Sequence, residues 1–81
     1  MSVWFYKSDG TDLFKAGIAD KLDDYLFRVS AQRESYLVSV EDVKEAIARA
    51  GELEIPPEVV QVLKLWTRRK ADNELLWFYV E

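Results

Sequence analysis

The chain has 81 residues, of which 49% are hydrophobic, and it carries a net charge of −4 with no cysteine and no histidine. This hydrophobic content is too high for a disordered chain, and the length suits a single domain with a small core that spans residues 1–81. The composition excludes disulfides, thiolate metal sites and catalysis by thiol or imidazole groups, and the negative charge weighs against non-specific binding to nucleic acid or to anionic membranes.

No targeting or membrane segment is evident in the sequence. The first six residues have neither the basic stretch nor the long apolar run of a signal peptide, and no segment is long and apolar enough to cross a bilayer. We therefore expect a cytoplasmic protein with no membrane partner. Only three side chains are amides, while Glu, Lys and Arg are abundant, a balance typical of proteins from thermophiles.

The first predicted element is a strand over residues 3–8. Three consecutive aromatic residues favour a strand here, because aromatic side chains pack well on a pleated, half-buried surface. Asp9-Gly10 follows as a dipeptide typical of tight turns, since glycine tolerates a positive φ.

Two interpretations of residues 11–16 are open, because they either begin a helix or return as the second strand of a hairpin. We favour the helix, since apolar residues from Phe14 to Val29 recur at intervals of three and four and so define one helical face. Gly17 within this segment costs about 1 kcal/mol relative to alanine in a helix.

A short extended segment over residues 36–38 precedes the second predicted helix. Ser39 and Asp42 match a capping box, in which each side chain bonds to the other residue's backbone N–H. Val43 begins the apolar stripe of this helix. The helix is expected to end just before Gly51, since glycine is favoured directly after a helix C-terminus.

The third predicted helix begins at Pro56-Pro57, because proline suits the first helical turn. Its inner face includes Leu63 and Trp66. The basic run of residues 68–70 closes it, in keeping with the preference of cations for helix C-termini.

The final predicted strand is residues 74–81, with six apolar or aromatic residues between two glutamates. Both of its alternating faces are apolar, so we expect both faces to be covered. We also expect residues 75–80 to pair with residues 3–7. The fold class is α+β, with three helices packed on a small antiparallel sheet that pairs the N- and C-terminal strands. From residue 11 onward, the order of helix, short strand, two helices and strand resembles a winged-helix arrangement.

No motif in the sequence points to catalysis or to a cofactor. Without histidine or cysteine, a serine or tyrosine nucleophile would need an unusual base, and the three glycines form no phosphate-binding loop. Asp20, Asp23 and Asp24 could hold a hard cation, but a solvated helix face beside Lys21 and Arg28 is the simpler interpretation. We expect a non-enzymatic protein with no catalytic, cofactor-binding or metal-binding residues.

The aromatic strands carry the main functional prediction. Helices on one side of a small sheet leave its other face open to water, and exposed aromatic faces usually mark association surfaces. Two sets of residues compete for the open face, depending on the register. The first set is Trp4, Tyr6, Trp77 and Tyr79, and the second is Val3, Phe5, Leu76, Phe78 and Val80. We favour the first set, because Trp and Tyr dominate binding hot spots, and expect it to bind a second copy of the chain or another protein.

The basic residues near the end of the third helix support an alternative function, that of a winged-helix DNA-binding regulator. These residues are Lys64, Arg68, Arg69 and Lys70. Their structural explanation is that cations complement the dipole at a helix C-terminus. The tip that would meet the bases carries Glu52, Glu54 and Glu58, which phosphate repels. A third option is a small acidic inhibitor of a nucleic-acid enzyme, a role that viral proteins fill.

Overall fold

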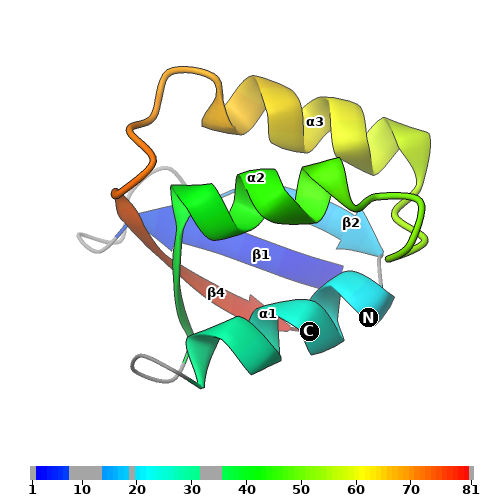
Figure 1. Ribbon diagram of the computed structural model, residues 1–81, viewed down its shortest axis with the longest axis horizontal. Coiled ribbons are helices and arrows are strands. Elements are labelled where there is room, and N and C mark those ends of the chain that lie inside the picture. Colours follow the sequence, from blue (N-terminus) through cyan, green and yellow to red (C-terminus); the bar gives the residue numbers. More distant parts are fainter. Residues whose placement is uncertain (1, 8–13, 19, 32–35, 81) are drawn as a thin grey trace.

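The computed structural model describes residues 2–7, 14–18, 20–31 and 36–80. In chain order the elements are β1 (Ser2–Lys7), β2 (Phe14–Ile18), α1 (Asp20–Ser30), β3 (Leu37–Ser39), α2 (Val40–Ala48), α3 (Pro57–Thr67) and β4 (Leu75–Val80). The helices cover one face of an antiparallel sheet (Figure 1). The predicted α+β class, with three helices on a small antiparallel sheet, is therefore confirmed, and the order of elements from α1 onward is compatible with a winged-helix-like arrangement.

The sheet contains four strands in the order β2-β1-β4-β3, so β1 and β4 lie at its centre. These two strands run antiparallel with Val3 opposite Val80, which confirms the predicted pairing of residues 3–7 with residues 75–80. β4 pairs with β3 along its other edge. The two most apolar strands are thus bonded on both sides, and the edge positions fall to the shorter β2 and β3, as is usual for strands that must resist aggregation.

Residues 14–18 form strand β2, so the helix interpretation of this segment was wrong and the hairpin interpretation is correct. β2 pairs antiparallel with β1, and Gly17 lies opposite Val3. Gly17 has low helix propensity, while pairing satisfies the backbone groups along an edge of β1. Tertiary pairing therefore outweighs the helical spacing of the apolar residues, and α1 begins only at Asp20. The turn predicted at residues 9–10 lies outside the described residues.

Helix α2 begins with the predicted capping box. The Ser39 hydroxyl accepts from the Asp42 N–H at 3.1 Å, and the Ser39 N–H donates to the Asp42 carboxylate at 2.9 Å. The N–H groups of residues 40–41 donate to the backbone carbonyls of Glu74 and Asp72 at 2.9 Å each. The N–H groups that a helix start leaves without helical partners are thus satisfied, and α2 is tied to the segment that leads into β4.

The turn between α2 and α3 differs from the prediction in one detail. Arg49 is the C-cap of α2, so Gly51 does not occupy the position directly after the cap. The left-handed backbone conformation falls on Glu54, with a φ of 53°. This conformation turns the chain so that the side chains of Leu53 and Ile55, on either side, are buried in the core.

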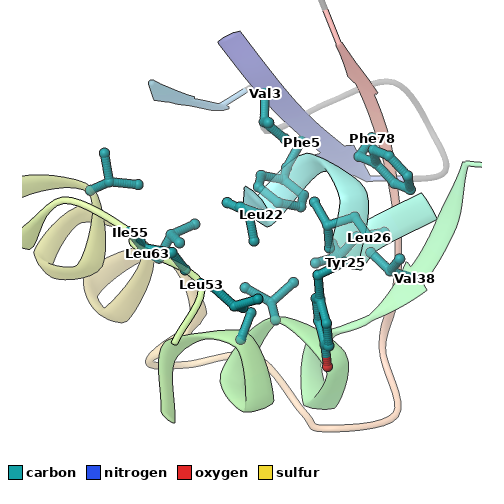
Figure 2. Packing of buried hydrophobic residues seen from close by; sticks show 14 of the residues in the cluster. Val3, Phe5, Leu22, Tyr25, Leu26, Val38, Leu53, Ile55, Leu63 and Phe78 are labelled. Carbon is teal, nitrogen blue, oxygen red and sulfur yellow. The ribbon is translucent and has the colours of Figure 1, made fainter. Parts of the chain in front are cut away.

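One apolar core lies between the sheet and the helices (Figure 2). The strands contribute Val3, Phe5, Val38, Leu76 and Phe78, α1 contributes Leu22, Tyr25 and Leu26, and α2, α3 and their turn contribute Val40, Val43, Ala46, Leu53, Ile55, Val59 and Leu63. The face of the sheet toward the helices, the inner face, is therefore built from the alternate set that includes Phe5 and Phe78. The favoured assignment of the two sheet faces is confirmed, because these two rings are fully buried.

An aromatic cluster closes one end of the core. The rings of Phe27 and Tyr36 lie edge-on to Phe78, with centroid distances of 5.4 and 5.8 Å. Tyr36 has a φ of 65°, which is rare for an aromatic residue, and its carbonyl accepts from the Phe78 N–H at 2.9 Å. This hydrogen bond and the ring contacts offset the cost of the unusual backbone conformation.

Tyr25 joins α1 to α2. Its ring is buried, the Arg49 guanidinium lies 5.6 Å from the ring centroid, and its hydroxyl donates to the backbone carbonyl of Asp42 at 3.3 Å. Burial, followed by the negative charges of Asp42 and Glu45, raises the pKa of the Tyr25 phenol above its ordinary value of 10.0. Ionisation of this phenol therefore opposes folding.

The raised pKa of Tyr25 predicts a loss of stability in alkali. The protonated phenol contributes fully below its unfolded pKa, and this contribution is lost as the pH rises through the folded-state value. Tyr25→Phe should cost about 1 kcal/mol or less near neutral pH through the lost hydrogen bond, yet lose less stability than the wild type above about pH 10. Urea unfolding across this range measures both effects. Equal pH slopes for the two proteins would contradict the assignment.

Phe78→Ala should lower the free energy of unfolding by about 3–5 kcal/mol, because it empties a fully buried site between the sheet and α1. Trp77→Ala is the matched control, since Trp77 is the preceding residue on the opposite side of the sheet and is only half-buried. Its loss of monomer stability should be smaller. Denaturant unfolding at low protein concentration compares the two variants, and a larger loss for Trp77→Ala would reverse the assignment of faces.

Candidate functional site

The side of the sheet turned away from the helices carries aromatic and aliphatic side chains. Alternation and register place there Lys15 of β2, Trp4 and Tyr6 of β1, Leu75, Trp77 and Tyr79 of β4, and Leu37 of β3. We call these seven residues the outer face. None of them is fully buried, and Leu75 and Tyr79 are 44% and 36% exposed. The outer face is thus a largely apolar surface over which none of the described helices lies.

The rings of the outer face pack against one another. The ring of Trp4 is parallel to that of Tyr79, with an interplanar angle of 1° and centroids 5.9 Å apart. Tyr6 also lies 5.9 Å from Tyr79, tilted by 60°. Trp77 lies directly opposite Tyr6 on β1 and Leu37 on β3, so it occupies the middle of the sheet. Contacts between the rings limit their motion, and the face is therefore largely pre-formed.

Trp4 has two further features. The Lys15 ammonium lies 5.3 Å from the centre of a Trp4 ring, within the range of a cation–π contact. The Trp4 indole nitrogen is buried and has no hydrogen-bond partner among the residues that the structure describes. An unsatisfied buried donor costs about 1–3 kcal/mol. The aromatic stack of the outer face therefore includes a polar group that the described residues leave without a hydrogen bond.

The structure brings together all four residues predicted to bind a partner, namely Trp4, Tyr6, Trp77 and Tyr79. Sequence reasoning missed Leu37, Leu75 and Lys15. Leu75 shares the alternation of Trp77 and Tyr79, so the pattern contained the signal. Lys15 joins the face only if its segment is a strand, and Leu37 lies in a segment too short to show a period.

The basic residues predicted for nucleic-acid binding fall into two groups. The Lys70 ammonium donates to the Trp66 carbonyl at 2.8 Å and lies 4.6 Å from the centre of a Trp66 ring, so Lys70 caps the C-terminus of α3. Lys64, Arg68 and Arg69 are exposed and have no ion-pair or hydrogen-bond partner in the described ranges. Only Lys70 therefore has a clear structural role.

Two of the three acidic residues at the tip between α2 and α3 pair with cations. Glu52 accepts hydrogen bonds of 3.0 and 3.1 Å from the Arg49 guanidinium, and these bonds together with its charge lower the pKa of the Glu52 carboxyl. Glu54 forms an ion pair of 3.2 Å with Lys21, and Glu58 is exposed at the start of α3. This tip therefore presents carboxylates to solvent.

The described part of the chain contains no group of three or more acidic side chains that could hold a metal ion, and no helix long and apolar enough to cross a bilayer. Asp23 is buried and Asp24 is exposed, so these two carboxylates do not share a surface. The side chain of Asp20 lies outside the described structure.

No family model, curated protein or solved structure matches this chain. The interpretation of the outer face and of the α3 cations therefore rests on the geometry and chemistry of their own residues.

Proposed function

We propose that this protein is a non-enzymatic protein-interaction module that associates through the outer face, and that its partner is a second copy of the same chain. The observation that carries the proposal is the asymmetry of the sheet. Both faces are rich in aromatic side chains, but helices cover only the inner one (Figure 1). Removing apolar surface from water contributes about 25 cal/mol per Å², so covering the outer face is favourable.

The chemistry of the outer face supports an identical partner. Lys15 is the one charged side chain among its seven residues, and it lies on the edge strand β2. Two copies related by a two-fold axis therefore bring mostly uncharged aromatic surfaces together. The repulsion between two chains of net charge −4 is largely screened beyond about 8–10 Å at physiological salt.

Trp77 is the expected anchor of this interface. It lies on a central strand between Tyr6 and Leu37, and its half-buried ring has neighbours on both sides. Residues that dominate binding energy are typically large aromatic side chains near the centre of an interface, surrounded by contacts that exclude water.

Trp77→Ala should weaken dimerisation by about 2 kcal/mol or more, roughly 30-fold in the dissociation constant, because it removes the central ring. Sedimentation velocity over a concentration series measures this change. Val62→Ala is the control, since Val62 is an exposed apolar side chain, at 38%, that lies on α3 and away from the outer face. That variant should dimerise as the wild type does. A wild-type chain that stays monomeric at tens of micromolar would remove the second copy as the partner.

A winged-helix DNA-binding regulator is the second candidate function. Lys64, Arg68 and Arg69, which have no partner among the described residues, favour it, whereas Glu58 at the start of α3 and the net charge of −4 oppose it. We therefore expect duplex DNA to bind no more tightly than about 1–100 µM at physiological salt, the non-specific range. Gel shifts test this expectation. A salt-dependent shift at sub-micromolar protein that is lost in the Arg68→Ala/Arg69→Ala double variant would favour the regulator.

A further inference from the structure

Helix α3 presents apolar side chains to solvent that the core does not use. Its core positions are Val59, Leu63 and Thr67, which recur every four residues and are at most 6% exposed. Val62 is 38% exposed and Leu65 is 68% exposed, the highest value among the large exposed apolar side chains in the described ranges. Leu65 and Val62 are three residues apart, so their side chains are neighbours on the helix surface.

Exposed cations lie close to Leu65 in the chain. Arg68 is the C-cap of α3, one helical turn beyond Leu65, Arg69 follows it in the turn after the helix, and Lys64 directly precedes Leu65. None of these cations has an ion-pair or hydrogen-bond partner among the described residues. In other parts of the fold, ion pairs join Lys21 to Glu54, Lys44 to Asp72 and Arg49 to Glu52. Three cations without an ion-pair partner among the described residues thus lie within four residues of an exposed leucine.

We propose that Val62, Lys64, Leu65, Arg68 and Arg69, the α3 patch, form a docking surface for an acidic amphipathic helix of another protein. Val62 and Leu65 contact the apolar stripe of that helix, whose side chains recur at three and four residues. Arg68 and Arg69 bind its carboxylates, because the guanidinium fork matches a carboxylate in a two-bond geometry. Charge complementarity selects an acidic partner over a basic or neutral one.

The ends of α3 also orient the partner. Glu58, Val62 and Leu65 follow one another at intervals of four and three residues, so they form one stripe along α3, and Arg68 caps the helix just beyond Leu65. The stripe is acidic at its N-terminal end, and a cation lies beyond its C-terminal end. The carboxylates of the partner therefore lie over the C-terminal half of α3 and away from Glu58.

Duplex DNA complements this surface less well than an acidic helix does. Phosphates would neutralise Arg68 and Arg69 but leave Val62 and Leu65 without apolar contacts, and Glu58 would repel the backbone. The α3 patch is also separate from the outer face, because α3 lies over the inner side of the sheet (Figure 1). A dimer formed through the outer face leaves both copies of the patch open.

Fluorescence anisotropy with a designed peptide tests the proposal on the full chain. The probe is a labelled peptide of about 18 residues with leucines at helical spacing and glutamates at most other positions. It should bind in the micromolar range at low salt. Leu65→Ala should weaken binding at least about fivefold, and the Arg68→Ala/Arg69→Ala double variant at least about tenfold. These side chains are exposed, so circular dichroism should show wild-type folding for both variants.

Two controls separate specific docking from general attraction of charges. A scrambled peptide of the same composition, which lacks the apolar stripe, should bind at least about fivefold more weakly. Lys21→Ala removes an exposed cation on α1 and should change the affinity by less than about twofold. The proposal is overturned if the acidic peptide does not bind, or if the scrambled peptide binds equally well. It is also overturned if a duplex DNA probe binds more tightly and Leu65→Ala leaves that affinity unchanged.

Discussion

The backbone of β4 is the constraint on which the rest of the structure depends. As a central strand it needs hydrogen-bond partners along both edges, and β1 and β3 supply them. The segment that leads into β4 is also fixed to α2. The carbonyls of Asp72 and Glu74 accept hydrogen bonds from the first turn of α2, and the Lys44 ammonium pairs with the Asp72 carboxylate at 2.6 Å. Strand and helix bonds thus set the position of β4 together.

Successive side chains of β4 lie alternately in the core and on the outer face. Phe78 is fully buried under the helices, while its neighbours Trp77 and Tyr79 lie on the outer face. This division was predictable, because alternation along a strand fixes which side chains share a face. Whether Lys64, Arg68 and Arg69 form ion pairs was not predictable. The carboxylate that pairs with a cation can lie on another element, as Glu54 does for Lys21.

Local signals predicted some elements and misled at others. The capping box at Ser39 depends on residues three apart, so the sequence alone was sufficient. The apolar spacing around residues 14–18 favoured a helix, and pairing with the open edge of β1 makes this segment a strand instead. The left-handed backbone at Tyr36 depends on a hydrogen bond from Phe78, a partner distant in sequence that no local pattern identifies.

The ribosome synthesises β1 first and β4 last, although these two strands pair with each other. Val3 pairs with Val80, so the first strand must wait for the last one. At a typical rate of 5–20 residues per second, that wait is roughly 4–15 s on the ribosome. During this time the nascent chain exposes Trp4, Phe5 and Tyr6 without the strand that completes the sheet. Folding therefore cannot proceed from the N-terminus outward, and the sheet can close only after residue 80 has been synthesised.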